Sequence, residues 1–219
     1  MRPDDVISAW VTRSLRRRAG AAADAQPAQP YPAAAVGALG EALVAGALRE
    51  MGWPALRNVV LRERDAFAEL DLLVRVPHAI IVLEVKTWSG FIDGAARAEH
   101  WIRYGSGGQA VSVPNAVRQN VAHVAMVERA IADREVAVFG LVVGAGHARY
   151  ATSLSSHVVP LAQLPDALRT HAAKLPLGSQ WALDRAWELM AREAEKSETR
   201  RAPHAAWVRS KRNHHSNCE

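Results

Sequence analysis

Apolar residues recur along the first half of the chain in two kinds of run, and these runs predict its first elements. Residues 33–51 (AAAVGALGEALVAGALREM) are rich in alanine and leucine and are followed by a glycine and a proline, which predicts a helix. Three short runs rich in β-branched residues then begin at Asn58, Glu69 and Ala79. Short connections separate these runs, so they predict a meander of three strands.

The second half of the chain alternates in the same way. Residues 90–113 are polar and contain glycines, and we expect a short hairpin that carries Trp101. A helix follows from Pro114, with apolar residues at helical spacing: Val117, Val121, Val124, Val127 and Ile131. An apolar run from Val136 predicts a further strand, and two helices are expected at about 163–174 and 180–196. This order predicts an α/β domain with one mixed sheet flanked by helices.

The same pattern divides the chain into four segments. Residues 1–32 are expected to be a basic segment with an Ala/Pro linker, and residues 33–150 the α/β core. Residues 151–196 are expected to form a helical extension, and residues 197–219 a basic disordered tail.

Composition and charge narrow the class of protein. The chain has 219 residues, of which 49% are hydrophobic and 22% charged, and this is the ordinary composition of a globular protein with a core. Its net charge of +5 favours an anionic partner such as nucleic acid. The single cysteine, Cys218, cannot form an internal disulfide, and no run approaches the roughly 18 apolar residues of a membrane span. We therefore expect a cytoplasmic protein without a membrane partner.

The strands that begin at Glu69 and Ala79 form the central hairpin, and both carry charged residues among apolar ones. The connection between its two strands centres on Pro77 and His78, so Val76 should face Ala79 and, further along, Asp71 should face Glu84. Directly opposed residues have Cβ atoms about 5 Å apart, and like charges placed so repel each other. Because side chains alternate along a strand, Lys86 shares the face of Asp71 and Glu84.

Two partly buried carboxylates are tolerated in few ways. One acid can keep its proton, a cationic side chain such as Lys86 can lie between them, or a divalent metal can bridge them. Taken singly, each of these residues is usually an edge charge or part of a plain salt bridge. Their convergence at one end of the sheet favours a site, in which Mg²⁺ held by two carboxylates would activate a phosphodiester and a water.

The residues around this hairpin resemble a known family. Asp71 followed by Glu84-Val85-Lys86 is similar to the core of the PD-(D/E)xK phosphodiesterase superfamily. The segments GALGEALVAGALREMG, NVVL, ELDLLVRVPHAIIVLEVKTWSGFIDG and VPNAVRQN, together with Trp101, resemble the nuclease-related domain (NERD) family over about residues 36–145. The resemblance implies a restriction-endonuclease-like core of α-β-β-β-α-β order and a metal-dependent nuclease that hydrolyses phosphodiester bonds in DNA, in repair or in defence against foreign DNA.

The resemblance also assigns roles to residues. It implies that Glu41, Asp71 and Glu84 hold one or two Mg²⁺ or Mn²⁺ ions, that Lys86 stabilises charge on the phosphate or steadies the attacking water, and that Gln119 helps with positioning. Taken alone, Gln119 would be an ordinary surface glutamine. Glu41 could equally lie on a solvated helix face, but it shares a side of its helix with Gly37, Val44 and Leu48, which is an unusual setting for a free acid. The sequence departs from the pattern at Leu70, where the superfamily name has proline, and at Thr87 and Trp88, where a smaller polar residue is expected after the lysine.

Contacts with nucleic acid are expected from an aromatic residue and from basic side chains. The candidates are Trp88, Arg118, Arg16, Arg17, Arg18, Lys211 and Arg212. A tryptophan can stack on an unpaired base, and arginines and lysines hold the backbone, although solvated ends of the chain show the same pattern. RNA stays an alternative to DNA as the nucleic-acid partner. The expected protein partner is a second copy of this chain or a helicase-type protein. The alternative function is a non-cleaving module that binds nucleic acid or recruits a partner and retains the nuclease fold.

Overall fold

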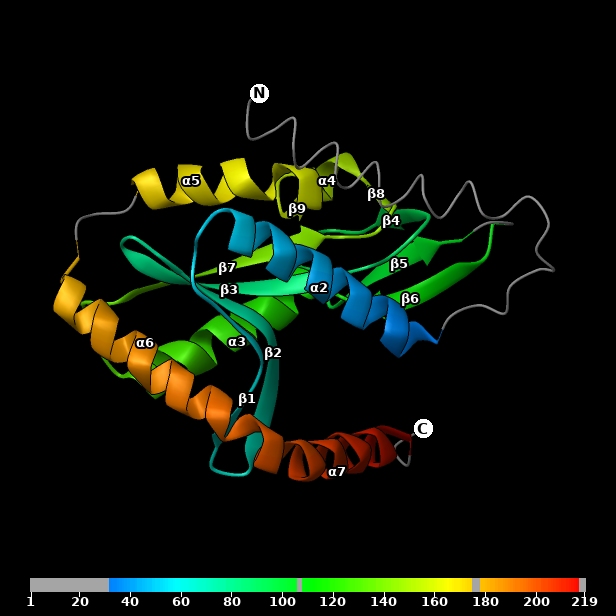
Figure 1. Cartoon of the computed structure of the whole chain (residues 1–219). Coiled ribbons are helices and arrows are strands. Elements are labelled where there is room, and N and C mark those ends of the chain that lie inside the picture. The colour runs from blue at the N-terminus through cyan, green and yellow to red at the C-terminus, as the bar shows by residue number, and fades with distance from the viewer. Residues whose placement is uncertain (1–31, 106–107, 175–177, 217–219) are drawn as a thin grey trace, which may run out of the picture.

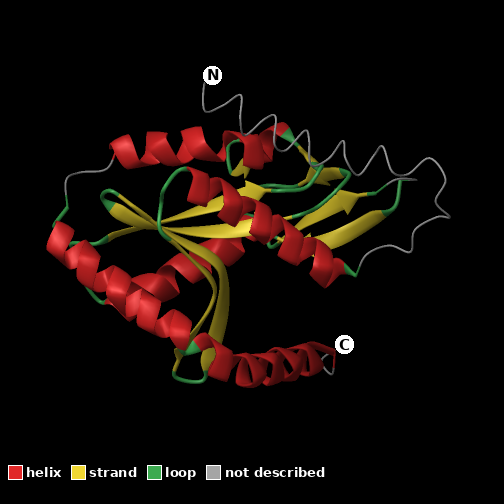
Figure 2. Ribbon diagram, in the orientation of Figure 1, coloured by secondary structure: helices red, strands yellow, loops and turns green. Residues whose placement is uncertain are grey.

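A computed structural model describes residues 32–105, 108–174 and 178–216, with side chains up to residue 210. Helices cover both faces of a twisted central sheet, and a second, smaller sheet lies at one end of it (Figures 1 and 2). The strands are β1 (Ala55–Glu63), β2 (Ala66–Val76), β3 (Ala79–Lys86), β4 (Phe91–Asp93), β5 (His100–Tyr104), β6 (Ala110–Pro114), β7 (Ala137–Gly144), β8 (Arg149–Tyr150) and β9 (Val158–Pro160). The helices are α2 (Ala33–Glu50), α3 (Ala116–Ile131), α4 (Thr152–Ser155), α5 (Leu164–Lys174), α6 (Gln180–Glu195) and α7 (Ser197–Ser216), with a 3₁₀ turn, η1, at Leu161–Gln163.

The central sheet is mixed, as the sequence predicts. In the described residues its strand order is β1-β2-β3-β7-β9. The first three strands are antiparallel neighbours, and β3, β7 and β9 run parallel. The predicted hairpin register is confirmed from Val76 opposite Ala79 to Leu72 opposite Leu83. The ladder ends there, one residue before Asp71, so the expected direct pairing of Asp71 with Glu84 does not form.

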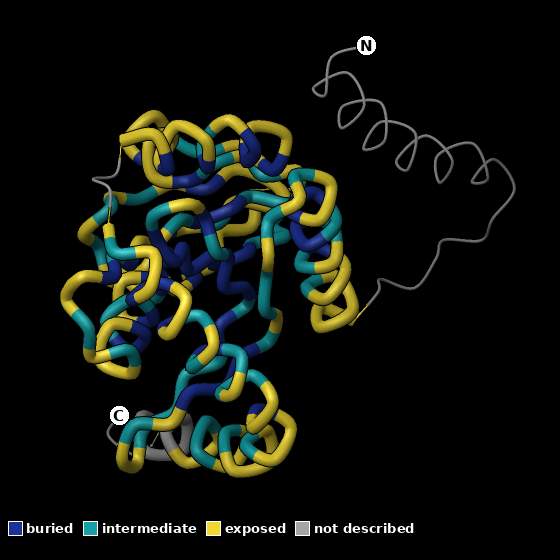
Figure 3. Tube along the Cα trace, turned by 60° about the vertical axis from the view of Figure 1, so that its left-hand side comes forward, coloured by how far each residue is buried: buried dark blue, intermediate teal, exposed yellow. Residues whose placement is uncertain are grey.

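Each face of the sheet is buried under a pair of helices. Alternate residues of the hairpin, such as Leu72 and Leu83, pack against α2 and α5, and the residues between them, such as Leu73 and Val82, pack against α3 and α6. Strand β3 is buried from Ala79 to Val85, because it is central in the sheet and covered on both faces. The buried residues lie in the middle of the molecule in Figure 3. The end of β3 is therefore a dry environment in which a charge needs a partner.

The smaller sheet has the order β6-β5-β4-β8 in the described residues and contains the predicted hairpin. Trp101 on β5 is fully buried, and its Nε1 donates a hydrogen bond of 3.0 Å to the carbonyl of Ala95. It packs with residues of β7 and β9, which joins the small sheet to the carboxyl end of the main one. Trp101 is thus a core residue.

The C-terminal third differs from the expected segmentation. Strand β9 lies beyond residue 150 yet forms the edge of the main sheet, and α5 and α6 contribute to its two buried clusters. The prediction of disorder from residue 197 is wrong for 197–216, which form helix α7. Composition suggested disorder because the segment has few apolar residues, but polar contacts with β1 hold its first turn. The N-terminal segment, residues 1–31, lies outside the described residues.

None of the helices in the described ranges is both long and apolar enough to cross a membrane. The architecture is a mixed α/β fold with a central mixed sheet, flanking helices and C-terminal helices, in agreement with the predicted fold class.

Candidate active site

A lysine and a glutamate meet at the carboxyl end of β3. Lys86 Nζ lies 2.6 Å from Glu84 Oε1 and 3.1 Å from Oε1 of Gln119 on α3, and it donates a hydrogen bond to each. The Glu84 side chain is only 1% exposed, whereas Lys86 is 18% exposed. The structure thus brings together three of the predicted residues, with the ammonium group at the boundary between the core and solvent.

Asp71 approaches this group from the neighbouring strand. Its Oδ2 accepts a hydrogen bond of 2.7 Å from the backbone N–H of Val85, between Glu84 and Lys86. Asp71 therefore extends the contact between β2 and β3 with its side chain where the backbone ladder has ended. Burial, reinforced by the negative charge of Glu84, raises the pKa of Asp71 from 3.8 to about 7.

The second oxygen of Glu84 faces His123, a residue that the sequence analysis missed. His123 Nδ1 lies 3.2 Å from Glu84 Oε2, which makes an ion pair when the imidazole is protonated. Neither atom has a hydrogen-bond partner among the described residues. Burial acts to raise the pKa of Glu84, but the contacts with His123 and Lys86 outweigh it and lower that pKa below the ordinary value.

The spacing of polar residues on α3 was the signal for His123. It lies four residues after Gln119, so the two share a face of the helix. The valines suggested a different inward face, and one of them, Val121, is in fact 63% exposed. Asn120 and His123 are buried instead, and Asn120 Nδ2 donates to the carbonyl of Val82 on β3 at 3.2 Å. Helix α3 thus turns a partly polar face toward the end of β3.

The first turn of α3 is fixed by Asn115. Its Oδ1 accepts hydrogen bonds from the backbone N–H groups of Val117 at 2.8 Å and Arg118 at 3.2 Å, which caps the helix. Its Nδ2 donates to two carbonyls of the loop before β5. This side chain therefore ties the start of the helix to the small sheet and holds Gln119, in the first turn, beside Lys86.

Helix α2 brings Glu41 to the same end of the sheet. Gly40 permits this approach, because a Cβ atom there would lie 2.1 Å from Cγ2 of Thr87, the residue after Lys86. Burial raises the pKa of Glu41, and the charges of Glu84 and Asp71 are near enough to couple with it. Glu41 and Asp71 line one open cleft of about 960 Å³, together with Gln119 and His123.

Only some of the residues predicted to contact nucleic acid lie near the site in the described part of the structure. Trp88 lies beside the site, with Lys86 Nζ 5.6 Å from its ring centroid, and it packs edge-on against Trp101 at 6.1 Å. Arg118 is exposed, next to Gln119. Arg16, Arg17 and Arg18 lie outside the described residues, and Lys211 and Arg212 lie on the last turns of α7, where side chains are not described.

The oxygen atoms of Asp71 and Glu84 fit a divalent cation in part. Asp71 and Glu84 supply the hard oxygen ligands that Mg²⁺ prefers, and Glu84 Oε2 is a buried acceptor without a hydrogen bond. The raised pKa of Asp71 indicates that this carboxylate is short of positive charge, which a divalent ion would supply, whereas Lys86 and His123 already compensate the charge of Glu84. Among the described residues, however, no group of three or more His, Cys, Asp and Glu side chains is close enough to hold a metal ion. Glu41 thus borders the pair without completing a shell.

Comparison with known protein families gives a match that covers the core of the chain. The profile of the nuclease-related domain family matches residues 36–145, which run from α2 to the residue after β7 and include all five residues predicted for the catalytic site. No curated protein and no solved structure matches the chain significantly.

Proposed function

The chain belongs to the nuclease-related domain family, and on that premise we propose that it is a metal-dependent nuclease that hydrolyses phosphodiester bonds in DNA. The observation that carries the proposal is the placement of Lys86 Nζ. It is held 2.6 Å from Glu84 and 3.1 Å from Gln119, at a strand end where Asp71 and Glu41 line a cleft. Membership of the family indicates a nuclease-related function. The hydrolysis of phosphodiester bonds, the metal ion and DNA as the substrate are what we propose.

The proposed roles follow from chemistry and position. Asp71 and Glu84 would hold a Mg²⁺ or Mn²⁺ ion, and Glu41 on α2 would add negative charge at the border of the site. When bound, such an ion polarises the phosphate and lowers the pKa of a water. Lys86, at the boundary with solvent, neutralises negative charge on the phosphate as it develops. Gln119 accepts a hydrogen bond from Lys86 and so orients the ammonium group.

His123 acts as a positioning residue. Its Nδ1 lies 3.2 Å from Glu84 Oε2, and it is nearly buried. It stands on the opposite side of the carboxylate from Lys86, so the two side chains fix the orientation of Glu84. A carboxylate with a fixed orientation binds a ligand without first losing side-chain freedom.

The test is cleavage of labelled single-stranded, duplex and nicked DNA with and without Mg²⁺. We expect wild type to cleave only with the ion, and Lys86→Met and Asp71→Asn to lose at least about 100-fold, as is usual when a charge-stabilising group is removed. Lys174→Met, an exposed lysine on α5, is the matched control and should cleave like wild type. Equal cleavage by wild type and Lys86→Met would exclude the proposed mechanism.

A second function is favoured by one observation. In the described residues the acids do not gather into a group able to hold a metal, and Lys86 already neutralises Glu84. A non-cleaving module that binds nucleic acid would need no more than this. Calorimetric titration with Mn²⁺ separates the two functions, because only the nuclease should show a site that is lost in Asp71→Asn.

A further inference from the structure

Helix α7 and the start of β2 form an aromatic wall of the cleft that borders the candidate site. Phe67 lies 6.3 Å from His204 and 6.3 Å from Trp207, measured between ring centroids, and the last two rings stack at 6.5 Å. All three residues line the same cleft as Glu41 and Asp71. We call Phe67, His204 and Trp207 the aromatic wall; two of its members lie outside the family match.

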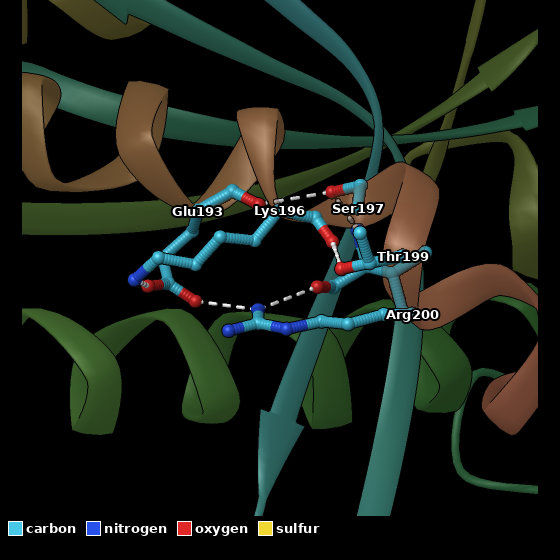
Figure 4. A network of polar contacts seen from close by, with 6 residues as sticks. Glu193, Lys196, Ser197, Thr199 and Arg200 are labelled. Atoms are coloured by element: carbon cyan, nitrogen blue, oxygen red, sulfur yellow. Dashed lines mark hydrogen bonds and ion pairs between the residues drawn. The ribbon is translucent and has the colours of Figure 1, made fainter.

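Polar contacts with the edge of the sheet hold α7 in this place. Val60 lies on β1, the edge strand of the main sheet. Its N–H donates to Ser197 Oγ at 2.8 Å, and its carbonyl accepts from Arg200 Nη1 at 2.9 Å. Arg200 also pairs with Glu193 of α6, as Figure 4 shows. Both backbone groups of one edge residue are thereby satisfied, and the first turn of α7 is pinned next to the cleft.

The rest of α7 contributes little to the core. None of the three buried apolar clusters contains an α7 residue, and Ser197 is its only buried residue up to 210. Figures 1 and 3 show α7 beside the curved end of the β1–β2 hairpin, apart from the body of the protein. Helices are normally stabilised by packing an apolar face on a core. The aromatic residues of α7 instead face Phe67 in the cleft.

Arginines surround the aromatic wall. The Arg62 guanidinium lies 5.6 Å from the Phe67 ring centroid, and Arg129 and Arg201 line the cleft. Arg129 pairs with Glu63, and Arg201 pairs with Glu198 and, at 3.8 Å, with Glu69; all of these ion pairs are exposed. Exposed ion pairs are weak, so a phosphate can replace the carboxylate partner at small cost. Aromatic faces beside exchangeable arginines are the combination that binds unpaired nucleotides.

We propose that the cleft between α2 and α7 binds single-stranded DNA, with a base stacked on the aromatic wall and the backbone leading to Asp71 and Lys86. The volume of about 960 Å³ lies at the upper end of pockets for small ligands, roughly 300–1,000 Å³. A cleft of this size takes a few linked nucleotides of one strand and does not enclose a double helix. This inference rests on the proposed function and adds the class of substrate.

The test is binding of a fluorescent oligothymidine by anisotropy in EDTA, so that no cleavage occurs, with a duplex of equal length as the second probe. Trp207→Leu keeps apolar bulk and removes the aromatic face. We expect it to weaken single-strand binding by about 5-fold to 150-fold, the range for stacking of one base. Trp207→Phe should stay within about 3-fold of wild type. Duplex binding should change little in either variant.

Trp181→Leu is the matched control, because Trp181 is 66% exposed on α6 and carries Arg185 4.6 Å above its ring. It should bind both probes like wild type. The inference is overturned if Trp207→Leu binds the single strand like wild type, or if single-strand and duplex binding fall equally. Circular dichroism checks folding, and if Trp207→Leu does not fold, Phe67→Leu gives the same comparison. Since EDTA removes catalysis, an inactive wild type would contradict the proposed function while leaving these binding results intact.

Discussion

Replacing Asp71 by asparagine should make the metal-free protein more stable at pH 8. Burial and the charge of Glu84 raise the pKa of Asp71 from 3.8 to about 7 in the folded protein. Folding therefore favours the protonated acid. The contribution of this group to stability is fully present below pH 3.8, falls as the pH rises, and is lost above about pH 7. Asparagine mimics the protonated acid at every pH, because it is neutral and still accepts a hydrogen bond from the N–H of Val85.

The magnitude follows from the size of this shift. Each pKa unit is worth about 1.4 kcal/mol, so a rise from 3.8 to about 7 corresponds to an upper limit of about 4 kcal/mol. Partial exposure of Asp71 and its coupling to Glu84 reduce this, and we expect roughly 2–3 kcal/mol at pH 8. For a chain of this length 1 kcal/mol moves the Tm by roughly 2–4 °C. Asp71→Asn should therefore melt roughly 4–12 °C above wild type at pH 8 and close to wild type at pH 4.

The assay is thermal unfolding in EDTA at a series of pH values, with urea unfolding as a second measure. Asp65→Asn, in the exposed turn between β1 and β2, is the control and should change the free energy of unfolding by no more than about 0.5 kcal/mol. Addition of Mg²⁺ at pH 8 should stabilise wild type and leave Asp71→Asn unchanged, because only the carboxylate pair binds the ion. The reasoning is refuted if Asp71→Asn melts below wild type at pH 8, or if the difference is the same at pH 4 and pH 8.

Two further predictions concern the supports of the site. Ser197→Ala leaves a buried N–H of β1 without a partner and should lower the free energy of unfolding, measured in urea, by about 1–3 kcal/mol. The control is Thr199→Ala, whose exposed hydroxyl donates to a backbone carbonyl, and it should lower that free energy by less than about 0.5 kcal/mol. Equal losses in the two variants would show that the buried contact is unimportant. Gly40→Ala places a Cβ 2.1 Å from Thr87 Cγ2 and should destabilise the folded protein by about 1–3 kcal/mol. In the control Gly37→Ala the new Cβ meets nothing within 4 Å, and the substitution should stabilise the folded protein by about 0.5–1 kcal/mol. Adding Thr87→Ser to Gly40→Ala should restore stability, and a failure to do so would place the obstacle elsewhere.

Four strands of the main sheet, β1, β2, β3 and β7, could be predicted because their signals are local, whereas β9 was not predicted. The turn at Pro77 and His78 fixes the hairpin register, and alternation along β2 and β3 assigns each residue to a face. The end of the ladder was not predictable in this way. Asp71 bonds the N–H of Val85 instead of pairing directly with Glu84, and such a switch from backbone to side chain leaves no trace in a pattern of hydrophobic residues.

Features that depend on contacts distant in sequence were missed. Helix α7 has little apolar periodicity, and it is held by hydrogen bonds from Ser197 and Arg200 to Val60, about 140 residues away. His123 was hidden because the valine spacing pointed to a face that includes the exposed Val121. In both cases buried polar contacts, which composition does not reveal, determined the position of the element.

The most direct test of the central claim is the anomalous scattering of Mn²⁺ in crystals of the protein soaked at pH 8. We expect a peak bonded to carboxylate oxygens of both Asp71, in the middle of β2, and Glu84, near the end of β3, and no such peak in Asp71→Asn crystals. A saturating soak without a peak there, or with Mn²⁺ bound only elsewhere, would contradict the account.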